Sequence, residues 1–150
     1  MSRGAQVTGR AMTEEFKKEY VLGDGSTITV EEVRARVSVV EPGVVKFLEP
    51  PTGSAEVLEL LGHFLQQDGK KFGRYVMVGD LTEANHPSAE YRETIVKWMR
   101  RQPCVHTCYV QPAGIVPRVA LRFMMGRAGV SHTVHPDMEE ALEVARQHLT

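Results

Sequence analysis

The sequence lacks four features that would each assign the chain to a particular class of protein. It has no apolar run near the roughly 20 residues of a membrane-spanning helix, and no apolar signal core at its N-terminus. Its two cysteines are too few for a secreted disulfide framework. Its formal net charge of -1 lacks the basic excess of a general nucleic-acid binder. We therefore expect a cytoplasmic protein with no transmembrane segment and no nucleic-acid partner.

What is present is the composition of one globular domain. The chain has 150 residues, of which 42% are hydrophobic and 25% are charged, and ordinary domains have roughly 100 to 200 residues. A chain of this length can stabilise a core without a disulfide or a metal ion. Because residues 1–25 are polar and interrupted by glycines, we expect a flexible N-terminal arm over 1–25 and a single domain over 26–150.

Hydrophobic periodicity predicts an α/β domain. A strand pattern begins at Thr27, continues over 36–40, and returns over 44–48 after the turn Pro42-Gly43. Helices are then expected at about 54–69, 87–101, 117–129 and 137–149, with strands between them at 75–78, 104–111 and 130–135. Because helix and strand alternate, the later strands should be largely parallel. The predicted fold is a small mixed sheet of four to five strands, with an N-terminal β-hairpin and about four helices.

This order of elements resembles the SpoIIAA-like, or anti-anti-sigma-factor-like, branch of the STAS-like family. The resembling segments are the hairpin over 37–48, the strand and turn over 75–82, and the C-terminal run over 129–142. The resemblance implies a mixed α/β sheet and a role in regulation or ligand-responsive interaction. Regulatory members of the family carry a phosphorylatable Ser or Thr at the start of the next helix, a position that Ser88 holds here. Pro87 and Glu90 replace the Asp and Gly that usually surround that residue.

The segment from Asp80 to Ser88 is where the sequence favours a site. It follows a predicted parallel strand, and ligands of open α/β sheets bind outside the carboxyl ends of such strands. Arg118 and Arg122 lie one turn apart on the third predicted helix, where they could meet a phosphate or an acidic partner. The expected ligand- or partner-binding residues are therefore Asp80, Thr82, His86, Ser88, Gly114, Arg118 and Arg122.

The small net charge conceals an uneven distribution of charge. Seven basic residues and Glu93 alone lie between residues 92 and 127, whereas the last predicted helix is acidic. The helix from Pro117 also has more apolar positions than one core-facing stripe requires. We assign Phe123 and Met124 to the core and expect the surplus to form a dimer or ligand surface. An anionic ligand is therefore compatible with this part of the chain.

Cys104, His106 and Cys108 alternate along a predicted strand but do not predict a metal site. The first and last thiol would be about 13 Å apart at 3.3 Å per residue, whereas a zinc–sulfur bond is only about 2.3 Å. We expect the three side chains to share one face of the sheet, as buried thiols and a hydrogen-bonded histidine. Neither a metal nor a cofactor is predicted.

Three functions are compatible with these observations. The favoured one is a non-catalytic module that binds a protein partner or a small apolar or anionic ligand, and that can form a homodimer through exposed apolar surface. The second is a phospho-regulated anti-sigma factor antagonist with Ser88 as the acceptor. The third is a small hydrolase that uses His86 and Ser88, although the sequence has no Gly-x-Ser-x-Gly elbow.

Overall fold

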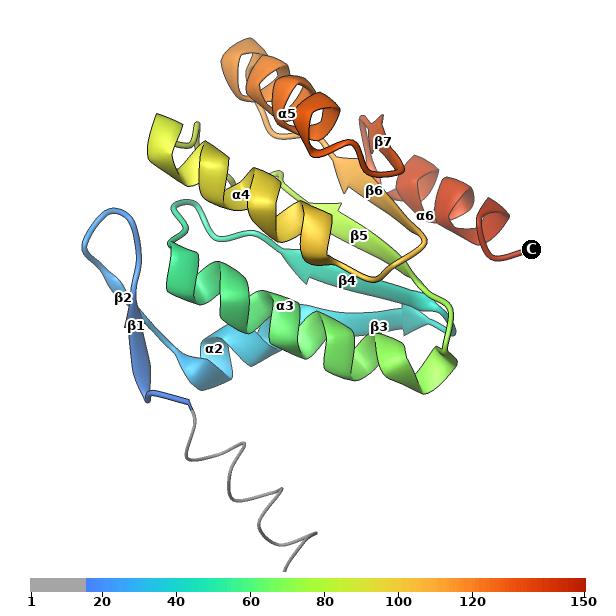
Figure 1. Cartoon of the computed structure of the whole chain (residues 1–150), viewed down its shortest axis with the longest axis horizontal. Helices are drawn as coiled ribbons and strands as arrows, with labels where there is room; N and C mark the ends of the chain where they lie inside the picture. Colours follow the sequence, from blue (N-terminus) through green and yellow to red (C-terminus); the bar gives the residue numbers. More distant parts are fainter. Residues whose placement is uncertain (1–15) are drawn as a thin grey trace, which may run out of the picture.

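A computed structural model describes residues 16–150 of the chain (Figure 1). The elements, in chain order, are β1 (Glu19–Val21), β2 (Thr27–Thr29), α2 (Val30–Ala35), β3 (Val37–Glu41), β4 (Val44–Leu48), α3 (Ala55–Gly69), the short 3-10 helix η1 (Lys70–Phe72), β5 (Val76–Asp80), α4 (Ala89–Arg101), β6 (His106–Val110), α5 (Ile115–Ala128), β7 (His132–His135) and α6 (Met138–Gln147). The predicted α/β class and the β3–β4 hairpin are confirmed. Within the described residues, no helix is both long and apolar enough to cross a membrane.

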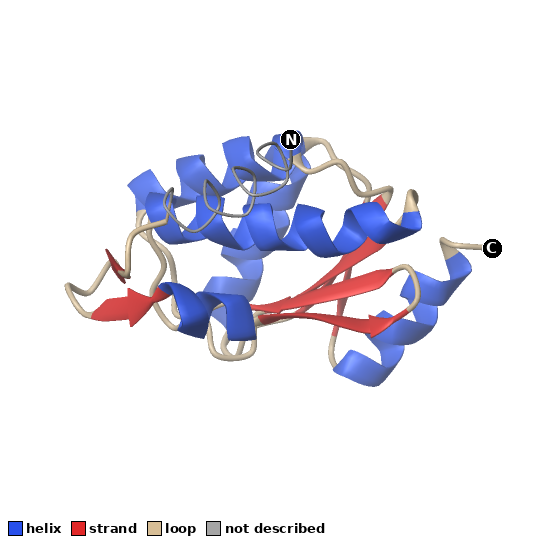
Figure 2. Ribbon diagram, turned by 90° about the horizontal axis from the view of Figure 1, so that it is seen from below, coloured by secondary structure: helices blue, strands red, loops and turns tan. Residues whose placement is uncertain are grey.

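The five-stranded sheet has its strands in chain order, β3-β4-β5-β6-β7. β3 is antiparallel to β4, and each later neighbour is parallel to the strand before it. Right-handed crossovers between parallel strands in this order place their connecting helices on one face of the sheet. Accordingly α3, α4 and α5 cover one face, and α6 packs against the other (Figure 2).

Local sequence signals account for most element boundaries. Gly43 has a φ of 84°, as the predicted turn between β3 and β4 requires. The side chains of Ser54, Ser88 and Asp137 each accept a hydrogen bond from a backbone N–H in the first turn of α3, α4 and α6. Gly129 ends α5 in the left-handed conformation. These caps explain why the predicted helices begin and end close to their expected positions.

Two expectations for the N-terminal region are wrong. The strand pattern from Thr27 is interrupted by α2, which starts at a capping box formed by Thr29 and Glu32. Residues 16–25 were expected to belong to the flexible arm, but Glu19–Val21 pair with β2 and Tyr20 is buried. The rest of the predicted arm, residues 1–15, lies outside the described residues.

A larger and a smaller apolar core lie on opposite faces of the sheet. The larger one joins Phe47, Met77 and Tyr109 to the helices α3, α4 and α5. The smaller one joins Val44, Val76, Val78 and Val110 to Ala141 and Ala145 of α6. Because successive residues of a strand point to opposite faces, each central strand contributes to both cores.

The glycine next to the last residue of β5 controls the packing of the larger core. A Cβ atom at Gly79 would lie 2.8 Å from Phe47 Cζ and 2.8 Å from Tyr109 Cδ1. Replacement of Gly79 by alanine should therefore overpack this layer and lower the free energy of unfolding by about 1 to 3 kcal/mol. Urea denaturation measures this change.

Gly126→Ala is the matched control because Gly126 lies on an exposed part of α5 with no atom within 4 Å of a new Cβ. Alanine there should be neutral or should stabilise by up to about 1 kcal/mol. Equal effects of the two substitutions would contradict the proposed steric role of Gly79.

Candidate functional site

A cavity of about 280 Å³ lies between the helix layer and the sheet. Its walls are formed by the segments that follow β4, β5 and β6, together with α4 and α5. It therefore occupies the carboxyl end of the parallel strands, as expected for a ligand site in an α/β sheet. Most of the lining side chains are aliphatic, aromatic or methionine.

Glu49 is the one acidic residue among the described residues that line this cavity. It directly follows β4, its backbone N–H donates to the carbonyl of Asp80 over 3.0 Å, and only 9% of its surface is exposed. Its Oε1 accepts a hydrogen bond of 3.0 Å from the Tyr91 hydroxyl. None of the ion pairs within residues 16–150 includes it. The cavity wall thus carries a buried carboxyl without a paired cation.

Burial controls the titration of Glu49. Removal from water raises the pKa of its carboxyl to about 7, against the opposing effects of the Tyr91 hydrogen bond and the Arg36 charge. Burial, followed by the Glu49 charge, also raises the pKa of the Tyr91 hydroxyl far above its usual range. Tyr91 therefore remains a hydrogen-bond donor while Glu49 changes between its neutral and charged forms.

The approach of Tyr91 to Glu49 depends on a glycine. A Cβ atom at Gly53 would lie 2.0 Å from the Tyr91 hydroxyl oxygen and 2.9 Å from Glu49 Oε1. Tyr91 itself is positioned by the start of α4, where its backbone N–H donates to Ser88 Oγ. The loop after β4 and the first turn of α4 together place the two polar groups.

Aromatic side chains form much of the cavity floor. Phe47 and Trp98 pack edge to face with ring centroids 5.9 Å apart. The Tyr109 hydroxyl donates to the Met99 sulfur. Trp98 is the single tryptophan of the chain, and its Nε1 has no hydrogen-bond partner within the described residues. Its indole N–H is therefore buried without an acceptor among the described residues, while the ring lines the cavity.

The structure brings together the two segments in which site residues were predicted. His86 and Ser88 line the cavity from one side, and Pro117 and Leu121 of α5 line it from another. His86 and Ser88 are exposed, so this side opens to solvent.

The other predicted site residues do not line the cavity. Asp80 Oδ1 accepts hydrogen bonds from the backbone N–H and the hydroxyl of Thr82, which closes a turn. Gly114 precedes α5 with a φ of 89°, and its carbonyl accepts from Arg118 Nε over 2.9 Å. Arg122 lies on the exposed side of α5. These four side chains and Gly114 belong to the surface around the site.

His86 and Ser88 do not form a nucleophile and base pair in this structure. His86 Nε2 lies 3.3 Å from Arg92 Nη1, and Ser88 Oγ accepts from the backbone of Tyr91. No hydrogen bond within the described residues joins the two side chains. The geometry that the hydrolase hypothesis needs is therefore not assembled here.

The outer face of α5 is apolar and exposed. Ile115, Val116, Val119 and Phe123 each expose more than 60% of their surface, Phe123 reaching 63%. The assignment of Phe123 to the core is therefore wrong, whereas Met124 is buried as predicted. The buried stripe of α5 consists of Ala120, Leu121, Met124, Met125 and Ala128. Phe123 falls outside this helical stripe and points outward.

Sequence reasoning missed Glu49, the most informative residue of the site. Its signal was an acidic residue directly after an apolar strand, in the position where parallel strands present ligand-binding side chains. Tyr91 lies in the first turn of α4, where it is partly buried. Its contact with Glu49 joins residues 42 positions apart and required the three-dimensional arrangement.

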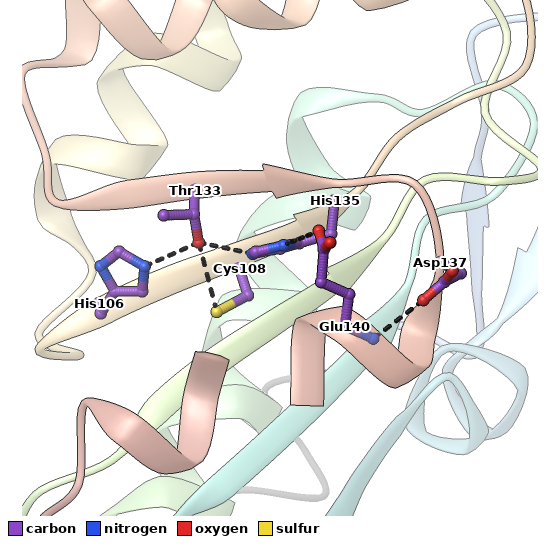
Figure 3. Close-up of polar contacts among 6 residues, drawn as sticks. All are labelled: His106, Cys108, Thr133, His135, Asp137 and Glu140. Atoms are coloured by element: carbon purple, nitrogen blue, oxygen red, sulfur yellow. Dashed lines mark hydrogen bonds and ion pairs between the residues drawn. The ribbon is translucent and has the colours of Figure 1, made fainter. Parts of the chain in front are cut away.

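A second polar cluster lies on the opposite face of the sheet, between β6, β7 and α6 (Figure 3). Thr133 Oγ1 lies 3.0 Å from His106 Nε2 and 2.6 Å from His135 Nε2. His135 Nδ1 lies 2.7 Å from Glu140 Oε2. His106 also contacts Ser131 Oγ at 2.7 Å. The histidines are thus held by hydroxyl and carboxylate groups, as the interpretation of His106 predicted.

Cys104 does not share this face. β6 begins at His106, and Cys104 packs against the larger core with its sulfur 3.4 Å from Thr107 Oγ1. Cys108 is buried in the smaller core on the opposite face. The expectation that both thiols lie beside His106 is therefore wrong, because the strand starts two residues later than predicted. Within the described residues, no group of three His, Cys, Asp or Glu side chains is placed to hold a metal ion.

The raised pKa of Glu49 predicts a pH-dependent stability. The unfolded chain releases this proton near pH 4.5, but the folded protein keeps it until about pH 7. The free energy of unfolding should therefore fall by up to about 3 kcal/mol as the pH rises through this range. Glu49→Gln removes the titration, so its stability relative to the native chain should increase from pH 4.5 to pH 7.5 in urea denaturation.

Glu83→Gln is the control for Glu49→Gln because Glu83 is exposed, lies near Arg36 at 3.9 Å, and does not line the cavity. A stability difference between Glu49→Gln and the native chain that stays constant with pH would contradict the assigned role of burial.

The lowered pKa of His106 predicts the opposite dependence of the free energy of unfolding on pH. Burial and the neighbouring His148, His132 and His135 lower the pKa of His106 to about 4, against an ordinary value of 6.5. Its contribution to stability is therefore lost as the pH falls from about 6.5 towards 4. His106→Gln should reduce this loss, by no more than about 3 kcal/mol. Thermal unfolding between pH 4 and pH 7.5 tests it, and an unchanged acid dependence in the variant would contradict the assignment.

The chain matches no protein-family model, no curated protein and no solved structure in the comparisons made. Its function is therefore inferred from the cavity and the residues around it.

Proposed function

We propose that this protein is a non-catalytic module that binds a small, largely apolar molecule in the cavity at the carboxyl ends of β4, β5 and β6. The observation that carries the proposal is an apolar cavity of about 280 Å³ with Glu49 and Tyr91 on its wall. Ligand sites are typically about 300 to 1,000 Å³ in volume, mostly apolar, and equipped with a few placed polar groups. A small ligand fits this description.

The surroundings of the cavity favour regulated binding. The loop that contains His86 and Ser88 and the first turns of α5 border the opening and are exposed. A ligand that contacts these two segments would change the surface that they present to a protein partner. The resemblance in element order to SpoIIAA-like, STAS-like proteins agrees with a regulatory role of this kind.

The exposed face of α5 is the surface on which such a partner, or a second copy of the chain, would dock. Ile115, Val116, Val119 and Phe123 are exposed there, next to Arg92 and His86. The same helix lines the cavity through Leu121 and Met124. Ligand binding inside and partner binding outside would therefore act on one helix.

Binding of neutral apolar molecules tests the proposal. Trp98 lines the cavity and is the single tryptophan, so its fluorescence should change when 2-phenylethanol or 1-hexanol binds. Leu121→Phe adds volume to the cavity wall and should weaken binding at least about tenfold, because the ligand and the larger side chain compete for the same space. Calorimetric titration provides the dissociation constants.

Val119→Phe is the matched control because it adds an aromatic ring to the exposed face of the same helix. It should leave the affinity within about a factor of two. The proposal is wrong if neither compound binds, or if Leu121→Phe and Val119→Phe bind them equally well.

A further inference from the structure

The ligand class depends on the charged groups inside the cavity. Glu49 is more than nine-tenths buried and lies on the wall. Its Oε1 accepts from Tyr91, whereas Oε2 has no hydrogen bond to a described residue. A buried carboxylate is stable only when it is paired or hydrogen-bonded, so Oε2 offers an acceptor position that a ligand can satisfy.

The described cavity lining holds no permanent positive charge, and His86 at the opening is its one basic side chain. No lysine or arginine lines it. Arg36 approaches Glu49 from outside the cavity, where its guanidinium donates to the carbonyl of Leu48 over 3.1 Å and lies 3.9 Å from Glu83. A ligand carboxylate or phosphate placed next to Glu49 would therefore meet a like charge without a compensating cation.

The remaining walls suit an organic cation. Phe47, Tyr91, Trp98 and Tyr109 provide four aromatic rings around one cavity. Aromatic rings attract ammonium groups through their quadrupoles, and the attraction is strongest where water is excluded. The aliphatic and methionine walls, such as Leu121 and Met124, would contact the apolar body of the same molecule.

We propose that the cavity selects a small apolar amine, whose protonated amino group pairs with Glu49 Oε2 and whose apolar body lies among the aromatic and aliphatic walls. This proposal rests on the proposed function of the cavity and specifies its ligand class. It differs from the anionic ligand that the basic segment between residues 92 and 127 suggests, because none of the lysines and arginines of that segment lines the cavity.

The test compares three compounds that share one aromatic body. These are 2-phenylethylamine, 2-phenylethanol and phenylacetate, which present a cation, a neutral hydroxyl and an anion. Their dissociation constants are measured at pH 8, where Glu49, with its pKa of about 7, is mostly charged. The amine should bind at least about tenfold more tightly than the alcohol, and phenylacetate should bind most weakly, since one charge-assisted hydrogen bond accounts for such a ratio.

Glu49→Gln should remove the preference for the amine while it leaves the affinity for 2-phenylethanol within about a factor of three. Glu83→Gln, outside the cavity lining, should behave as the native chain. Circular dichroism of each variant separates a change in binding from a loss of structure. The comparison of the three compounds is made on the native chain, so it does not depend on the folding of any variant.

Each outcome decides between the two proposals. If the alcohol binds as tightly as the amine, or if phenylacetate binds most tightly, the amine proposal is overturned and the proposed function of the cavity stands. Retention of the amine preference in folded Glu49→Gln also overturns it. If none of the three compounds binds, both proposals are overturned.

Discussion

The sequential order of the parallel strands is the constraint from which the site follows. Because β4, β5, β6 and β7 pair in chain order, their right-handed crossovers place α3, α4 and α5 on one face. Because these strands are parallel, the segments that follow β4, β5 and β6 all lie at the carboxyl ends of the strands, on the same side of the sheet. These segments must rise from the sheet to the helix layer, and the cavity lies where they diverge. The site is therefore a consequence of topology before any polar residue is considered.

The two faces of the sheet carry polar groups whose titrations oppose each other. Glu49, beneath the three helices, is neutralised by burial, so its proton stabilises the folded protein in acid. His106, on the face covered by α6, is kept uncharged by burial and by other histidines, so its proton destabilises the folded protein in acid. Between about pH 4.5 and 6.5 the two contributions partly cancel. The pH dependence of stability in the native chain alone would therefore conceal both contributions. The variants Glu49→Gln and His106→Gln separate them.

Local signals were sufficient to predict most of the fold, because caps and turns act over a few residues. Ser54, Ser88, Asp137 and Gly129 define helix ends that the sequence already indicated. The short helix α2 was missed because its capping box lies inside an alternating pattern that also favours a strand. Phe123 was misplaced because several apolar positions on one helix leave more than one stripe able to face the core.

The site was harder to predict than the fold because its polar pair joins distant parts of the chain. The loop around His86 and Ser88 was predicted as a site because it follows a parallel strand, and both residues line the cavity. Glu49 follows a parallel strand as well, but its burial depends on Tyr91 and on the space left by Gly53. Hydrophobic periodicity along the sequence indicates neither the contact between Glu49 and Tyr91 nor the space left by Gly53.

The charge of the site differs in sign from the charge of the segment around it. The basic residues between 92 and 127 lie largely at the surface, where several are paired or hydrogen-bonded within the domain, such as Arg127 with Glu93 and Arg101 with Glu59. Water and salt screen those charges. Glu49 is shielded from both, so one carboxyl exerts more influence on a ligand in the cavity than several guanidinium groups outside it. In the proposed site, the burial of one carboxyl therefore bears more on the charge of the ligand than the net charge of the chain or of a segment does.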